Sequence, residues 1–171
     1  MCKYVFYNHQ CFEIIELDVL SGHTNTVHEV HYLRSQPHVS FSCSSDGTLR
    51  FWDVRQSSPV RAVSAGAAEL FTCGANCQDT VVAAGTENEV LFWYNFCFTW
   101  HHLCRDLRTF QQLGRFTESH TNEVTQVRFH PTLPGKLFSG AVDGLINVMD
   151  VTASSEDDAL FGGCDLRFIM F

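Results

Sequence analysis

One segment of this chain occurs twice, and this repetition limits the folds open to it more than any other feature. Residues 23–55 and 120–152 align without a gap at a spacing of 97 residues, and 12 of the 33 aligned pairs are identical. The identical pairs include the first histidine of each copy, a serine and an Asp-Gly pair. Self-similarity of this kind indicates structural units that stack on one another to bury a continuous core.

Each copy has the pattern of short β-strands joined by tight turns. In Val27–Leu33 every second residue shares a face, with His28, Val30 and Tyr32 on one side, and the second copy keeps this alternation. Asp46-Gly47 and Asp143-Gly144 are turn signals, because Asp and Gly tolerate positive φ. The sequence therefore predicts an all-β chain.

The first copy opens with Gly22-His23, has Asp46 23 residues after the histidine, and closes with Trp52-Asp53. A Gly-His start and a Trp-Asp end within about 40–45 residues are the signature of a propeller blade. In these residues the chain resembles the WD-repeat family, whose prototype is the β subunit of heterotrimeric G proteins. The resemblance implies four-stranded blades and a role as a scaffold for protein complexes.

A spacing of 97 residues is too long for one blade and fits two blades with an insertion. The expected middle blade lacks Gly-His, and its Trp93 is followed by Tyr94 instead of Asp. We predict five regions in order: a partial blade or outer strand at 1–21, a WD blade at 22–66, a degenerate WD blade at 67–117 with an atypical insertion at 95–112, an incomplete WD blade at 118–152, and an acidic then apolar tail at 153–171.

The predicted fold class is thus all-β: a partial WD-repeat β-propeller of about three four-stranded blades, and not a closed seven-blade ring. Propellers close with about four to eight blades. An open arc leaves two blade faces uncovered, and large uncovered apolar faces associate with other surfaces. Self-association through the open blade faces is therefore expected.

By the same resemblance, the marked residues form a hydrogen-bonded chain inside each blade. The histidine bridges the turn aspartate and a strand serine, and that serine accepts the indole N–H of the tryptophan. Buried polar groups need such partners, and a fully paired network favours one geometry. In the second copy Met149 replaces the tryptophan, so the chain should stop at the serine. The predicted network comprises His23, Ser42 or Ser44, Asp46 and Trp52, then His120, Ser139 and Asp143.

The resemblance also suggests where partners bind. In propellers of this type, partners dock on the rim formed by the Gly-His loops and the turns between the second and third strands. The predicted partner-binding residues are Asn25, Thr26, Ser45, Asn122, Glu123 and Val142.

Charge and composition exclude several function classes. The net charge of −8 argues against nonspecific binding to nucleic acid or an anionic membrane, both of which attract basic patches. The apolar run Val90–Trp100 is shorter than the roughly 20 residues of a membrane span. The run Tyr4–Tyr7 is too short for the apolar part of a secretory signal, so the eight cysteines are expected to be reduced. We expect a cytoplasmic or nuclear protein whose partners are other proteins.

The sequence contains no catalytic constellation that we can identify, no phosphate-binding glycine loop and no Gly-x-Ser-x-Gly motif. The residues Cys97, His101, His102 and Cys104 are of the types that zinc prefers, but the two cysteines have six residues between them, where structural sites usually have two to four. Core packing is the expected role of Cys73 and Cys77. No cofactor and no metal site are predicted.

The leading hypothesis is a non-catalytic WD-repeat scaffold that mediates protein–protein interaction. Two alternatives remain open. One is a truncated or degenerate WD-repeat remnant without independent function, which the lost tryptophan and the atypical insertion favour. The other is a metal-binding protein that uses the Cys/His segment.

Overall fold

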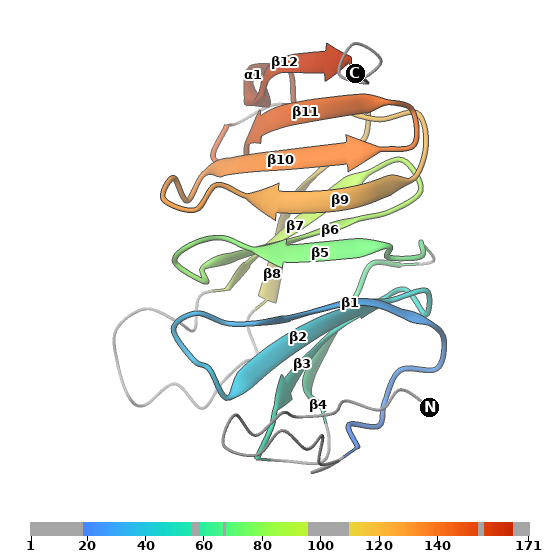
Figure 1. Ribbon diagram of the computed structural model, residues 1–171, viewed down its shortest axis with the longest axis vertical. Coiled ribbons are helices and arrows are strands. Elements are labelled where there is room, and N and C mark those ends of the chain that lie inside the picture. The colour runs from blue at the N-terminus through green and yellow to red at the C-terminus, as the bar shows by residue number, and fades with distance from the viewer. Residues whose placement is uncertain (1–18, 56–58, 67, 96–109, 154–155, 166–171) are drawn as a thin grey trace, which may run out of the picture.

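The structure is a computed structural model that describes residues 19–55, 59–66, 68–95, 110–153 and 156–165. These residues form three four-stranded antiparallel sheets, which follow one another along the long axis of the molecule (Figure 1). The predicted all-β class and the three four-stranded blades are confirmed. Among the described residues, no helix is long and apolar enough to cross a membrane.

Each blade is a meander in which strands pair in the order of the chain. The first blade contains β1 (Val27–Tyr32), β2 (Val39–Ser44), β3 (Thr48–Asp53) and β4 (Pro59–Ser64). The second contains β5 (Thr72–Ala75), β6 (Val81–Gly85), β7 (Val90–Asn95) and β8 (Phe110–Phe116). The third contains β9 (Val124–Phe129), β10 (Lys136–Ala141), β11 (Leu145–Asp150) and β12 (Leu160–Asp165), with the short helix α1 (Glu156–Ala159) before β12.

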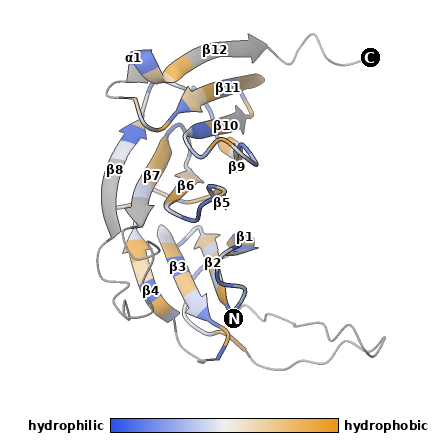
Figure 2. Ribbon diagram, turned by 90° about the vertical axis from the view of Figure 1, so that its left-hand side faces the viewer, coloured by the Kyte–Doolittle hydropathy of each residue, from blue (hydrophilic) through white to orange (hydrophobic). Residues whose placement is uncertain are grey.

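The blades lie with their first strands on the same side of the molecule. Figure 2 shows β1, β5 and β9 along one side and the outer strands β4 and β8 along the other. The first strands of neighbouring blades are in contact, β5 with both β1 and β9. This arrangement brings side chains of three separate blades together on one inner surface.

The Asp-Gly turns adopt the conformation that their residues favour. Gly47 has a φ of 73° and Gly144 a φ of 84°, both in the left-handed region open to glycine. In each turn the aspartate also accepts a hydrogen bond from the backbone two residues later, Asp46 from Thr48 N and Asp143 from Leu145 N, both at 2.9 Å. These local contacts fix the reversal between the second and third strands.

The apolar core lies between the sheets. One cluster joins the first blade to the second: the rings of Phe41 and Phe51 stack on each other at 5.7 Å between centroids, and the same cluster contains Leu70 and Trp93. A second cluster joins the second blade to the third and includes Phe92, Val124 and Met149 of those two blades. Each face of the middle blade is therefore buried by a neighbour.

The third blade differs from the predicted organisation. The sequence predicted an incomplete blade at 118–152 followed by an acidic then apolar tail at 153–171, whereas β12 from this tail pairs with β11 and completes the blade. The chain reverses through α1, where the acidic residues before Ala159 lie, and Ala159 itself is buried. Gly162 and Gly163 within β12 explain why the sequence gave no strand signal, because glycine is depleted in strands.

Candidate functional site

In the first blade the structure brings His23, Ser42, Asp46 and Trp52 together. Trp52 Nε1 donates to Ser42 Oγ at 2.8 Å, and the same oxygen lies 2.8 Å from His23 Nε2. His23 Nδ1 lies 2.9 Å from Asp46 Oδ2. Of the two serines considered from the sequence, Ser42 is the one in this chain, while Ser44 donates to the Asn25 carbonyl at 3.3 Å. We call this set, with its counterpart in the third blade, the histidine clasp.

The protons of the first clasp can be assigned from its chemistry. An ionised carboxylate only accepts hydrogen bonds, so Nδ1 of His23 carries the proton and Nε2 accepts from Ser42. Burial lowers the pKa of His23, although Asp46 opposes this effect. Burial would raise the pKa of Asp46, but hydrogen bonds from Thr48, from Thr24 N and from His23 outweigh it and hold that pKa well below its usual range. A neutral histidine thus faces an ionised aspartate.

The third blade repeats this geometry without the tryptophan. His120 Nδ1 lies 3.1 Å from Asp143 Oδ2, and its Nε2 lies 2.8 Å from Ser139 Oγ. Met149, at the tryptophan position, is fully buried and has no N–H to donate. Sequence reasoning missed Asn147, which is buried beside Ser139, donates to the Ser119 carbonyl and lies 3.4 Å from His120 Nε2.

The middle blade fills the corresponding positions with apolar side chains. Ala84 pairs with Leu91 across β6 and β7, as Ser42 pairs with Arg50 in the first blade. Trp93 occupies the place of Trp52, and all three apolar residues belong to the core shared with the first blade. The blade that looks most degenerate in sequence is therefore well packed.

The six residues predicted to bind partners lie in two equivalent pairs of loops. Ser45 N donates to the Thr26 carbonyl and Val142 N to the Glu123 carbonyl, both at 2.9 Å. Asn25 and Asn122 each accept the next backbone N–H at 2.8 Å. All but the partly exposed Ser45 are exposed, Val142 to 57%. We call this surface, made of Asn25, Thr26, Ser45, Asn122, Glu123 and Val142, the Gly-His rim.

A second polar cluster, which sequence reasoning missed, joins all three blades around Glu29. Glu29 Oε2 accepts from Thr72 Oγ1 at 2.7 Å and from Cys73 N at 2.9 Å, both on β5. Glu29 Oε1 pairs with Arg128 Nη2 of β9 at 2.5 Å. Thr72 Oγ1 in turn accepts from Val127 N at 3.2 Å. The Glu29 carboxylate of the first blade thus binds side-chain or backbone donors of β5 and β9, the inner strands of the other two blades.

Ionisation in this inter-blade cluster follows from its contacts. Burial would raise the pKa of Glu29, but the neighbouring His31 and the donors of Arg128, Thr72 and Cys73 outweigh it and hold that pKa well below its usual range. Burial, together with the neighbouring Cys43, raises the pKa of the Cys73 thiol. At neutral pH, Glu29 is therefore ionised and Cys73 keeps its proton.

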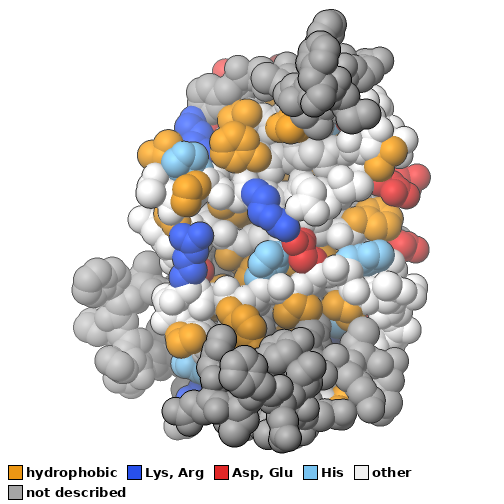
Figure 3. Space-filling view, in the orientation of Figure 1, with side chains coloured by type: hydrophobic (Ala, Val, Ile, Leu, Met, Phe, Trp, Pro, Cys, Tyr) orange, Lys and Arg blue, Asp and Glu red, His pale blue; other side chains and the backbone are white. Residues whose placement is uncertain are grey.

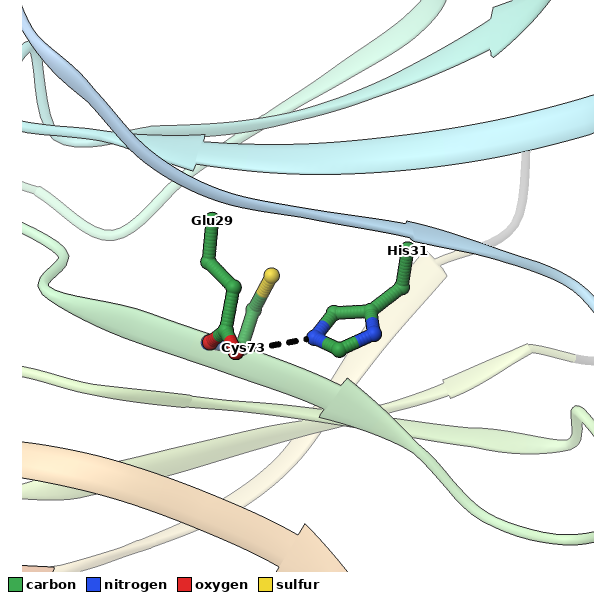
Figure 4. Close-up of side chains that lie close together, drawn as sticks. All are labelled: Glu29, His31 and Cys73. Atoms are coloured by element: carbon green, nitrogen blue, oxygen red, sulfur yellow. Dashed lines mark hydrogen bonds and ion pairs between the residues drawn. The ribbon is translucent and has the colours of Figure 1, made fainter. Parts of the chain in front are cut away.

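Three side chains of the cluster are of metal-ligand types. Figure 4 shows Glu29 and His31 reaching from β1 toward β5, which carries Cys73, and their ligand atoms all lie within 4.8 Å of one another. Zinc needs a thiolate and free carboxylate oxygens. Here both oxygens of Glu29 already accept hydrogen bonds, one from Thr72 and Cys73 N and the other from Arg128. The geometry fits a structural contact between blades better than a metal centre. We call the contacts of Glu29 with Thr72, Cys73 and Arg128 the Glu29 latch.

The Cys and His residues weighed as metal ligands in the sequence fall elsewhere. Cys97, His101, His102 and Cys104 lie outside the described residues. Cys43, Cys73 and Cys77 are free thiols, with Cys43 and Cys73 in the core and Cys77 partly exposed. No ligand cluster beyond the one at Glu29 was found among the residues that the structure describes.

The repeats match a known family model. The model described as "WD domain, G-beta repeat" matches residues 15–53 and 110–150, which include both histidine clasps. The chain belongs to the WD-repeat family. The resemblance inferred from the sequence is confirmed, and the blades and clasps of this WD-repeat protein follow the pattern of that family.

Curated relatives extend the similarity beyond the two matched segments. The chain is 36% identical over 142 residues to WD repeat-containing protein GTS1 of Arabidopsis thaliana, covering 80% of this chain and 33% of that protein. It is 32% identical over 144 residues to WD repeat-containing protein 89 homolog of Dictyostelium discoideum, covering 84% and 36%. It is 26% identical over 151 residues to Ribosome biogenesis protein YTM1 of Coprinopsis cinerea, covering 87% and 31%. The chain spans about a third of the length of these relatives.

Replacement of His23 by alanine should destabilise the WD-repeat protein. It leaves Asp46 without its histidine donor and Ser42 without an acceptor for its proton, which costs roughly 1–3 kcal/mol of unfolding free energy. Urea denaturation followed by circular dichroism measures this loss. The exposed Ser35, in the same blade, is the control, and Ser35→Ala should change stability by less than about 0.5 kcal/mol. Equal losses in the two variants would contradict the role given to the clasp.

The Glu29 latch predicts an acid-dependent loss of stability. The pKa of Glu29 is lower in the folded state, so the unfolded chain binds the proton more tightly and low pH favours unfolding. The contribution is complete above the unfolded pKa of about 4.3 and is lost as the pH falls below it. Urea midpoints measured from pH 7 to pH 3 should therefore fall less steeply for Glu29→Gln than for wild type. The exposed Glu69 gives the control, since Glu69→Gln should keep the wild-type slope. If the urea midpoint falls equally steeply with pH in all three proteins, Glu29 does not stabilise the contact between the blades.

Proposed function

We propose that this WD-repeat protein is a non-catalytic scaffold that binds other proteins through the Gly-His rim. The observation that carries this proposal is the pairing of each rim loop with a histidine clasp. Asp46 accepts from Thr24 N and Asp143 from Thr121 N, both at 3.0 Å, so the clasp that stabilises the blade also holds the loop beside the rim residues. Loops held on a rigid framework are the usual place of binding residues.

The clasps themselves resemble catalytic machinery, but their burial argues against that role. Ser42, His23 and Asp46 have the connectivity of a Ser-His-Asp triad. A nucleophilic serine must be reached by substrate, whereas Ser42 is 0% exposed and its oxygen accepts the Trp52 indole. In the third blade Ser139 and His120 are likewise buried. The burial of both sets supports a structural role and hence a scaffold.

The relatives support the same class of function. One of them is named a ribosome biogenesis protein, and a scaffold that holds proteins together suits such assembly work. We propose that the partners are proteins, with no requirement for nucleic acid, membrane or cofactor. We propose the cytoplasm or nucleus as the compartment, where thiols such as Cys43 and Cys73 stay reduced.

We also propose self-association through the face of the third blade that points away from the second. Phe138, Ile146 and Val148 lie on this face and are partly exposed. By the 97-residue spacing, they correspond to Phe41, Leu49 and Phe51 of the first blade, which the second blade buries completely. The equivalent surface of the third blade therefore has the composition of a blade–blade contact, which a second copy of the chain can cover.

Alanine at all six rim positions should remove the partners of the protein. The variant keeps the clasps and both cores, so circular dichroism should match that of the wild type. Affinity purification from cells with mass spectrometry compares its partners with those of wild type and of a control that carries Val60→Ala and Ser64→Ala on β4. A rim variant that is folded and retains every wild-type partner would refute the proposal.

Replacing Phe138 and Val148 with serine should abolish self-association, because it removes apolar area from the uncovered face. Sedimentation velocity over a concentration series is the measurement. The wild-type mass should rise with concentration, while the double variant should stay at the monomer mass of 19.4 kDa. Val60→Ser on the outer strand β4 should behave as wild type. If the wild-type protein stays monomeric over the whole concentration series, self-association through this face is refuted.

A further inference from the structure

The loops at the opposite end of the inner strands from the Gly-His rim form a second connected surface. These loops join β1 to β2, β5 to β6 and β9 to β10. Ser35 N of the first donates to Asp79 Oδ2 of the second at 2.6 Å. Asn76 Nδ2 of the second donates to the Pro134 carbonyl of the third at 3.2 Å. All three blades thus contribute to a surface whose parts are fixed relative to one another.

A pocket with a volume of about 150 Å³ opens on this surface. Its walls come from every blade and include Tyr32, Arg34, Gly74, Asp79, Arg128 and Phe129. Cavities of about 150 Å³ hold a molecule the size of benzene, whereas drug-sized ligands and cofactors occupy about 300–1,000 Å³. The pocket therefore has room for one side chain of a partner and not for a cofactor.

The exposed charges at the pocket are cationic. Arg34 is exposed, and the side chain of Arg128 is 48% exposed. The carboxylates nearby already have partners within the protein. Asp79 is buried and accepts a hydrogen bond from Ser35 N, and Glu29 forms an ion pair with Arg128. Figure 3 shows Lys and Arg side chains over the left half and centre of this face, Asp and Glu side chains along its right edge, and one acidic side chain at the centre beside a basic one. On a protein with a net charge of −8, the charged groups exposed at this pocket are thus two arginines, while the carboxylates of Glu29 and Asp79 that balance them lie deeper.

Both arginines retain donors for a ligand. A guanidinium carries five N–H donors. Arg34 uses one on the Pro131 carbonyl at 3.4 Å. Arg128 uses Nη2 on Glu29 and Nη1 on the Val127 carbonyl. Each arginine can therefore direct an N–H donor at a carboxylate that enters the pocket, and hydrogen bonds between charged groups are among the strong ones.

Exposed apolar side chains lie in the wall of the pocket and on one of the loops that form this surface. Tyr32 in its wall and Leu133 in the β9–β10 loop are each 51% exposed. Exposed tyrosine and arginine together are typical of the residues that carry most of the energy at protein interfaces. The surface therefore suits a peptide with both acidic and apolar residues.

We propose that this pocket binds an acidic side chain of a partner protein. An extended segment of the partner places an Asp or Glu carboxylate between Arg34 and Arg128, and its neighbouring apolar residues pack on Tyr32 and Leu133. The inference rests on the proposed scaffold function in that the ligand is a protein. It adds a second binding surface, separate from the Gly-His rim, and it specifies the chemistry of the segment bound there.

Fluorescence anisotropy of the full chain with a labelled peptide tests the proposal. The probe carries Glu-Leu-Glu-Leu between Gly-Ser flanks, and a matched probe carries Gln in place of Glu. The Glu peptide should bind about tenfold or more tightly than the Gln peptide, because hydrogen bonds to charged groups are the stronger ones. Raising the salt concentration should weaken its binding.

Arg34→Gln is the informative variant, since Arg34 lies outside the Glu29 latch and its loss leaves the blades joined. It should weaken the Glu peptide about tenfold, and Tyr32→Ala should weaken both peptides. Arg115→Gln on the outer strand β8 removes another exposed arginine and should have no effect. Unchanged affinity in Arg34→Gln, equal binding of the two peptides, or no binding by wild type would each overturn the proposal.

Two further measurements distinguish the proposed pocket from a simple anion site and from binding at the Gly-His rim. If inorganic phosphate displaces the Glu peptide when the two are present at equal concentration, the pocket is a simple anion site and the proposal is wrong. The six-alanine variant of the Gly-His rim should bind the Glu peptide as wild type does. If that variant loses its cellular partners but keeps the peptide, both surfaces function. Failure of the rim and failure of the pocket therefore give different results.

Discussion

Packing between sheets stabilises this protein, because a single four-stranded sheet has two faces and no second layer of its own. Phe41 and Phe51 of the first blade are buried in one core cluster together with Leu70 and Trp93 of the second. The second blade in turn covers Met149 of the third. Each sheet thus depends on its neighbour for a core, as in other repeat architectures. The polar contacts that cross the blade boundaries work within this constraint, since a carboxylate between two sheets must find its donors on both.

The three blades satisfy the same internal position in three ways. The first uses Trp52 and a serine bonded to a histidine, the third keeps the serine and histidine but has Met149, and the second has Trp93 over alanine and leucine. A blade can therefore pack without a clasp. What the clasp adds in the two blades that have it is a loop held by the aspartate, at Thr24 and at Thr121. This links the clasp to loop presentation more closely than to core formation.

The sequence predicted what is local or repeated. His23 and Asp46 follow from the family pattern, and the turns follow from Asp-Gly. The choice between Ser42 and Ser44 could not be made, because both point to the same face and only the position of Trp52 decides between them. Glu29 and Arg128 were missed because they are 99 residues apart and meet only when three inner strands lie together. The strand β12 was missed because its two glycines carry no strand pattern.

The Glu29 latch also determines the character of the pocket beside it. Arg128 is held by Glu29 on one side and by the Val127 carbonyl on the other, so its charge is fixed in place before any ligand arrives. Arg34 has one long contact, to Pro131, and can move toward a ligand at little cost. Arg128 favours binding because little side-chain freedom is lost when a ligand arrives. Arg34 favours it because its side chain can adjust to the position of the carboxylate. The residue that joins the three blades thus prepares the surface at which an acidic segment would bind.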